Sequence, residues 1–145
     1  KLMKPYLLED IISKDETQHF KLPGICQAIS PRAATLLSGM MVSVIDNGHG
    51  SKAQIPGYYL AGKTGTAEVA EKGVYGARNI HSFIGFGPVD DARFVILVKL
   101  DNPQKGSFSS QTAAPVFNQV AKYLLAYYHI PPQYDERDYR HWQRG

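Results

Sequence analysis

Two stretches of the chain repeat apolar side chains every three or four residues, which is the spacing of an amphipathic helix. The first begins after Ser30-Pro31, an N-cap residue followed by proline at the first helical position, and ends before Gly48. Its apolar positions are Ala33, Leu36, Leu37, Met40, Met41 and Val44. We expect Met40 and Met41 to pack in the core, because they lie on this apolar face.

The second helical stretch lies near the end of the chain. Pro115 suits its first turn, and Ile130-Pro131-Pro132 ends it. Its apolar positions are Val116, Phe117, Val120, Ala121, Leu124, Leu125 and Tyr128. The two helices flank a central part in which the apolar pattern changes.

This central part is rich in β-branched and aromatic residues, as strands are. Residues 80–86 and 93–100 are predicted strands, and residues 58–61 are predicted to begin a third. Residues 94–98 are nearly all apolar, so we expect both faces of that strand to be buried. Residues 69–79 are expected to form a loop.

Before the first helix, residues 6–12 and 19–22 are short β-like stretches around a polar turn at 14–17, which predicts a small hairpin. The rest of the order is helix, three antiparallel strands and helix, without repeats. This order predicts an α+β (mixed α/β) fold, in which antiparallel strands are flanked by helices.

Composition narrows the classes of function. The 145 residues, 43% hydrophobic and 20% charged, suit one globular domain. The net charge is +3 without a basic run longer than two residues, so we predict no nucleic-acid partner. Cys26 is the only cysteine and the five histidines lack paired spacing, so we predict neither metal nor cofactor. No stretch approaches the roughly 18 apolar residues of a membrane span.

Gly57 to Thr64 matches the phosphate-binding pattern G-x-x-x-x-G-K-[ST], and Asp101 follows an apolar strand as a magnesium ligand would. That mechanism requires a flexible loop followed by a helix that begins at the lysine. Residues 58–61 are bulky and suit a strand, and Gly65 would fall in the first turn of the required helix. A phosphate-loop protein is therefore the remote alternative.

The same lysine opens the run Lys63-Thr64-Gly65-Thr66, and K-T-G is a motif of penicillin-binding proteins and class A β-lactamases. On a strand beside a cleft, Thr64 and Thr66 would offer hydroxyl donors to a carboxylate and Lys63 a positive charge. Gly65 would leave the backbone open to a ligand. The N–H of Thr66 is a candidate oxyanion-hole donor. The catalytic candidates are therefore Lys63 and Thr66, and the substrate-binding candidates are Thr64, Gly65 and Thr66.

The sequence around this run resembles class B penicillin-binding proteins over residues 1–132. The segments that carry the resemblance are Ser30 to Val44, Pro56 to Glu68, Ser82 to Pro88, Arg93 to Pro103 and Ala113 to Phe117. Asn102-Pro103 and Ala114-Pro115-Val116-Phe117 are most similar to the division-type (septal) members. The resemblance implies that residues 1–132 are the C-terminal part of a transpeptidase domain and that residues 133–145 are a polar C-terminal tail.

The resemblance implies a peptidoglycan D,D-transpeptidase, in which a serine attacks the D-Ala-D-Ala bond of a stem peptide and passes the acyl group to a neighbouring strand's amine. Stem peptides and β-lactams would be its ligands, and division proteins are candidate partners. The implied location is the periplasmic face of the bacterial cytoplasmic membrane, with the membrane anchor outside this chain. Tyr75, Arg78 and Asn79 would lie at the rim of the cleft.

The motifs for the nucleophile are absent from the chain. No serine stands three residues before a lysine, and no S-x-N element precedes Lys63. The chain begins at Lys1 directly in a patterned segment, so we expect a piece of a longer protein that is inactive alone. Its expected partner is the N-terminal portion of the same protein, which carries the serine. A serine β-lactamase-like hydrolase and a non-catalytic binding module remain the alternatives.

Overall fold

The computed structural model describes residues 2–3, 10–14, 16–19, 24–71 and 74–135. The chain divides into two compact units, Lys1–Leu36 and Leu37–Gly145, each with its own strand pairing. None of the helices in the described ranges is long and apolar enough to cross a membrane.

The first unit contains two antiparallel pairs of short strands. They are β1 (Leu2–Met3) with β4 (Gly24–Cys26) and β2 (Asp10–Ile12) with β3 (Thr17–His19). The turn of the second pair is closed by a hydrogen bond from the Ser13 N–H to the Glu16 carbonyl, 2.8 Å long. A hairpin is confirmed here, but its second strand begins at Thr17, inside the turn predicted at 14–17. Residues 6–9, 15 and 20–22 lie outside the described residues.

Helix α1 (Pro31–Asp46) begins where the sequence predicts. The Ser30 hydroxyl accepts a hydrogen bond from the Ala33 N–H at 3.2 Å, which is N-cap geometry. Met40 is 67% exposed, however, so its prediction as a core residue was wrong. Helical spacing identifies side chains that share a face, but it does not say whether another element covers that face.

The second unit is built on a three-stranded antiparallel sheet in the order β5-β6-β7. Its strands are β5 (Ala61–Glu71), β6 (Val74–Gly87) and β7 (Phe94–Asp101). The loop predicted at residues 69–79 was wrong, because β5 and β6 stay paired as far as Glu71 opposite Val74. A register shift after Glu68 lets the pairing continue through this polar stretch.

The strand predicted at residues 58–61 starts only at its last residue, Ala61. Gly57 has a φ of 89°, which turns the chain out of an extended path. The Tyr58 hydroxyl then donates to the Ile130 carbonyl at 2.7 Å, and the Tyr59 N–H donates to the Gln133 side chain at 2.9 Å. These tyrosines hold the segment that follows the last helix.

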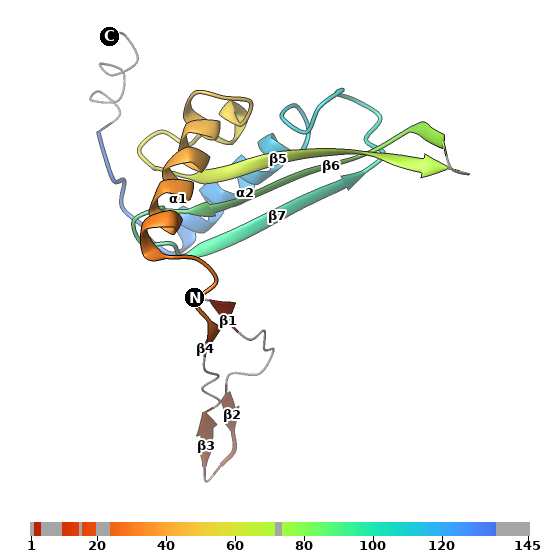
Figure 1. Ribbon diagram of the computed structural model, residues 1–145. Helices are drawn as coiled ribbons and strands as arrows, with labels where there is room; N and C mark the ends of the chain where they lie inside the picture. The colour runs from red at the N-terminus through yellow and green to blue at the C-terminus, as the bar shows by residue number, and fades with distance from the viewer. Residues whose placement is uncertain (1, 4–9, 15, 20–23, 72–73, 136–145) are drawn as a thin grey trace. The chain divides into compact units, whose positions relative to one another are not determined.

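Helix α2 (Ala113–Tyr127) lies across one face of the sheet (Figure 1). The rings of Phe83 on β6 and Phe117 on α2 are both fully buried, with centroids 4.8 Å apart. Gly85 leaves room for this contact, because a Cβ there would come within 2.7 Å of the Phe117 ring. The core of the second unit is therefore the layer between α2 and the sheet, together with Ile45 of α1 and the buried residues Ala53, Ile55 and Leu60 that precede β5.

The opposite face of the sheet carries an exposed apolar patch. Along β7, Val98 is 8% exposed, whereas its neighbour Leu97 is 65% exposed and Val95 is 70% exposed. Ile84 pairs with Leu97 and is exposed as well. The prediction that both faces of this strand are buried was wrong for the described residues, since α2 covers one face only.

Gly85→Ala tests the packing between α2 and the sheet. The added methyl group would overlap Phe117, and we expect a loss of about 1–3 kcal/mol in the free energy of unfolding. Gly39→Ala on α1 is the matched control, because a Cβ there meets no atom within 4 Å and should add up to about 1 kcal/mol through helix propensity. Urea denaturation followed by circular dichroism measures both, and equal stability of the two variants would contradict this packing.

Candidate functional site

All four residues of the lysine run lie in the first part of β5. Strand β5 is at an edge of the described sheet, with β6 on one side only. On such a strand, alternate backbone N–H and C=O groups point away from the neighbouring strand and are open to an extended ligand. The strand thus brings Lys63, Thr64, Gly65 and Thr66 together on an open edge.

The two threonines lie on the face of the sheet that α2 covers. Thr64 is directly opposite Phe83 and Thr66 is directly opposite His81, and directly opposed residues share a face. Lys63 is opposite Ile84 and therefore belongs to the other face. Its ammonium nevertheless donates hydrogen bonds to the Thr64 carbonyl at 3.0 Å and the Thr64 hydroxyl at 3.4 Å.

A cleft of about 170 Å³ opens beside the threonines. Its lining comes from three segments: the loop after α1, strand β5 and the loop between β7 and α2. The residues that line it are His49, Thr64, Thr66, Phe108, Ser109 and Ser110. Four hydroxyls and one imidazole thus surround a small space, which suits a ligand with a compact polar end.

Ser109 joins the β7–α2 loop to the lysine strand. Its side chain is fully buried, and its Oγ lies 2.5 Å from both the Gly65 carbonyl oxygen and the Thr66 Oγ1. The Ser109 carbonyl accepts hydrogen bonds from the N–H groups of Thr112 at 3.3 Å and Ala114 at 3.0 Å. The start of α2 therefore fixes the serine that contacts Gly65 and Thr66.

His81 connects the same loop to the central strand. It is 1% exposed, and its Nδ1 lies 2.9 Å from the Thr112 Oγ1. In the part of the chain that the structure describes, no group of three or more His, Cys, Asp or Glu side chains could hold a metal ion.

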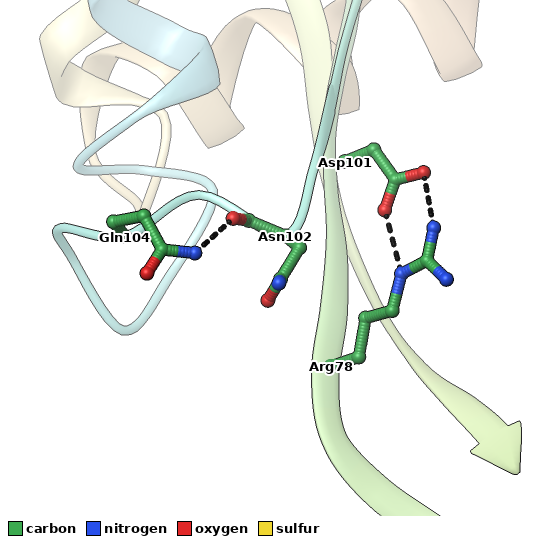
Figure 2. A network of polar contacts seen from close by, with 4 residues as sticks. All are labelled: Arg78, Asp101, Asn102 and Gln104. Atoms are coloured by element: carbon green, nitrogen blue, oxygen red, sulfur yellow. Dashed lines mark hydrogen bonds and ion pairs between the residues drawn. The ribbon is translucent and has the colours of Figure 1, made fainter.

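Arg78, near the start of β6, forms an ion pair with Asp101 at the end of the neighbouring strand β7 (Figure 2). Its Nε and Nη2 donate to the two carboxylate oxygens of Asp101, at 3.1 and 2.8 Å. The hydrogen bond from Arg78 holds the pKa of Asp101 below its ordinary value of 3.8. Next along the chain, the Asn102 carbonyl accepts a hydrogen bond from the Gln104 amide at 2.9 Å.

These contacts contradict the phosphate-loop alternative. Lys63 lies inside a strand, and no helix begins at it. Asp101, the proposed magnesium ligand, is instead engaged by Arg78. The backbone around Lys63 cannot wrap a phosphate, because a pleated strand turns successive N–H groups to opposite sides.

Sequence reasoning missed His49 and Ser109. His49 had no partner at metal-ligand spacing, and Ser109 is separated from Thr66 by 43 positions in an irregular loop. Only Ser109 has a local sequence signal, because it lies a few residues before the helix whose start Pro115 indicates. No periodic pattern links that loop to β5, so the contact could come only from the packing of α2.

The chain matches the model of the penicillin binding protein transpeptidase domain over residues 1–122. It is 38% identical over 109 residues to the peptidoglycan D,D-transpeptidase FtsI homolog of Mesostigma viride, covering 73% of this chain and 18% of that protein. It is 33% identical over 140 residues to penicillin-binding protein PbpB of Mycolicibacterium smegmatis, covering 88% and 22%. The chain thus spans about a fifth of the length of these curated relatives.

Solved structures show the same likeness. The transpeptidase domain of Burkholderia pseudomallei penicillin-binding protein 3 superposes with a TM-score of 0.71 and 31% identity, covering 79% of this chain and 35% of that chain. Penicillin-binding protein 3 of Mycobacterium tuberculosis, solved in complex with aztreonam, superposes with a TM-score of 0.73 and 28% identity, covering 88% and 31%.

The ion pair between Arg78 and Asp101 predicts a pH-dependent contribution to stability. Because folding lowers the pKa of Asp101, the contribution is present above the unfolded value of 3.8 and is lost as the pH falls through the lowered pKa. We expect Arg78→Gln to lower the melting temperature at pH 7 and to have a smaller effect near pH ~3. Arg93→Gln, which removes an exposed pair with Asp91, is the control. A deficit of Arg78→Gln that is equal at both pH values would contradict this linkage.

Proposed function

Because the chain belongs to the penicillin-binding-protein transpeptidase family, among the division-type members of class B, we propose that it forms one wall of a peptidoglycan D,D-transpeptidase site. The observation that carries the proposal is the position of the lysine run, on an edge strand with both threonines beside a small cleft of hydroxyls. A peptide that ends in a carboxylate needs both features, a strand edge for its backbone and a polar cleft for its end.

The substrate in this proposal is a stem peptide that ends in D-Ala-D-Ala. Its backbone extends along the free edge of β5 and its terminal carboxylate enters the cleft. Hydroxyl groups of Thr64 and Thr66 line that cleft, and the Lys63 ammonium is held 3.0 Å from the Thr64 carbonyl. Gly65 presents no side chain that could obstruct the peptide.

The chemistry is a double acyl transfer. A serine oxygen attacks the carbonyl of the penultimate D-Ala, the C–N bond breaks, and the terminal D-Ala leaves with its amine protonated. The amine of a second strand then attacks the ester carbonyl and releases the serine. We assign the Thr66 N–H to the oxyanion hole, where it stabilises the charge that both tetrahedral intermediates place on the carbonyl oxygen. Lys63 supplies a positive charge beside the carboxylate.

The partner in this proposal is the N-terminal portion of the same protein, which supplies the serine that the chain lacks. Two observations support it. The chain spans about a fifth of its curated relatives, and the face of the sheet that α2 leaves open exposes Ile84, Val95 and Leu97. Burying these side chains would stabilise the association through the hydrophobic effect.

The family also supports a proposal for the cellular location of the reaction. Peptidoglycan lies outside the cytoplasm, so we assign the site to the outer face of the cytoplasmic membrane, with division proteins as further partners. We assign residues 1–132 to the transpeptidase domain and residues 133–145 to a C-terminal tail. Gln133 at the start of this tail donates to Asp90 at 2.8 Å.

Lys63→Ala in the full-length protein tests this role. Removing a charged partner of the carboxylate should slow acylation by a fluorescent penicillin roughly 10- to 100-fold. Lys122→Ala, on the exposed surface of α2, is the matched control and should acylate like the wild type. Gel fluorescence over time measures the rate constant. Acylation of Lys63→Ala at the wild-type rate would show that Lys63 does not contribute to binding or acylation at this site.

The isolated chain should form no adduct with penicillin, because it contains no serine three residues before a lysine. The full-length protein should form one that persists for hours, as expected of a transpeptidase whose acyl-enzyme excludes water. Intact-mass spectrometry distinguishes the two samples. Rapid loss of the adduct with release of penicilloate would instead indicate a β-lactamase-like hydrolase.

A further inference from the structure

The segment that follows α2 contacts the chain just before the lysine strand. The Gln133 N–H donates to the Gly57 carbonyl at 2.7 Å. The Gln133 side chain accepts a hydrogen bond from the Tyr59 N–H at 2.9 Å and donates one to the Asp90 carboxylate at 2.8 Å. One residue therefore joins three segments that lie far apart in the sequence.

The two side-chain partners fix the orientation of the Gln133 amide. A backbone N–H can only donate, so the Gln133 Oε1 faces Tyr59. An ionised carboxylate can only accept, so the Gln133 Nε2 faces Asp90. Both ends of the amide are used, and an alkyl side chain at this position could make neither contact.

The chain just before β5 is held by these contacts and not by a neighbouring strand. Strand pairing with β6 begins at Ala61, so residues 57–60 lie outside the described sheet. The Tyr59 carbonyl accepts a hydrogen bond from the Val89 N–H at 3.0 Å, and the Tyr59 N–H donates to Gln133. The turn after β6 and the segment after α2 thus satisfy the backbone of Tyr59.

Packing alone does not fix this junction. A cavity of about 480 Å³ is lined by residues of both the turn after β6 and the segment after α2, among them Asp90 and Gln133. Leu60 is 1% exposed, which sets how deeply the chain lies in the core. Hydrophobic burial is non-directional, however, whereas a hydrogen bond depends on distance and angle. The bonds of Gln133 therefore fix the position of the chain along the strand direction.

A short, closely packed stretch links Tyr59 to the lysine run. Ala61 is fully buried, and a Cβ at Gly62 would come within 2.7 Å of the Phe83 ring. Close-packed interiors transmit displacements, because they contain little free space to absorb them. A shift of Tyr59 along the strand would therefore reach Lys63.

We propose that Gln133 is a positioning residue of the transpeptidase site, which acts through the Tyr59 N–H and the Asp90 carboxylate to fix the lysine run relative to the substrate. The proposal rests on the proposed function, because it assumes that acylation uses this strand. An oxyanion-hole donor such as the Thr66 N–H must lie about 2.7–3.1 Å from the reacting oxygen. A small displacement of β5 would therefore slow the reaction, although Gln133 itself contacts no substrate.

Gln133→Ala in the full-length protein removes both side-chain bonds. The acylation rate constant at saturating penicillin should fall roughly 5- to 50-fold, since a displacement of about 1 Å can cost about 100-fold. Stopped-flow fluorescence measures this rate constant, and the melting temperature is measured separately. A merely structural role would lower the melting temperature and leave the rate constant of the folded protein unchanged. Gln119→Ala, at an exposed glutamine of α2, is the matched control and should acylate like the wild type.

Exchanging the two partners provides a rescue. Gln133→Glu keeps an acceptor for the Tyr59 N–H but places a second carboxylate beside Asp90, so it should slow acylation. Asp90→Asn alone should acylate like the wild type, because its amide oxygen still accepts from Gln133. The double variant Gln133→Glu with Asp90→Asn restores every bond with the donor and acceptor exchanged, and it should recover most of the rate.

Amide hydrogen exchange of residues 59–66, measured by mass spectrometry without penicillin, gives a readout that does not depend on acylation. Gln133→Ala should accelerate exchange there, because the Tyr59 N–H loses its acceptor. A wild-type rate constant in Gln133→Ala, or no recovery in the double variant, would overturn the proposal. If Gln133→Ala does not fold, Gln133→Glu and the double variant decide. Failure of the wild-type protein to be acylated would contradict the proposed function instead, and unchanged amide exchange in Gln133→Ala would still overturn the positioning role.

Discussion

The contact between Phe83 and Phe117 is the interaction on which the rest of the second unit depends. It holds α2 against the sheet with two fully buried rings, and Gly85 provides the space for it. Because α2 begins at Ala113, its position also fixes Ser109, whose carbonyl bonds to the first turn. Ser109 in turn holds Gly65 and Thr66. A hydrophobic contact in the core thus helps to position the loop that lines the cleft.

Helix α2 buries one face of the sheet and leaves the other face exposed. Phe83 and Val98 face α2, whereas Ile84 and Leu97 face outward with about half or more of their surface exposed. An exposed patch of paired apolar residues is typical of a protein interface. The cleft beside β5 is lined by four hydroxyls, one imidazole and one phenyl ring. Both features are consistent with the proposal that another part of the same protein completes the site.

Much of this fold follows from the sequence. The periodic spacing and the Ser30-Pro31 cap predict α1, and the K-T-G motif places the run of Lys63 on a strand. The incorrect predictions have physical reasons. Periodicity could not show that Met40 and Leu97 are exposed, because burial depends on elements outside the pattern. The prolonged β5–β6 pairing crosses a register shift between Glu68 and Ala70, and no periodic pattern in the sequence indicates such a shift. The role of Ser109 depends on a contact across 43 positions.

The central claim is that the cleft beside β5, lined by the hydroxyls of Thr64 and Thr66, binds the terminal carboxylate of the substrate. A crystal structure of the full-length protein acylated by a penicillin tests it most directly. The account predicts that the penicillin carboxylate lies in this cleft, within hydrogen-bond distance of the threonine hydroxyls that line it. A carboxylate bound outside this cleft would contradict it.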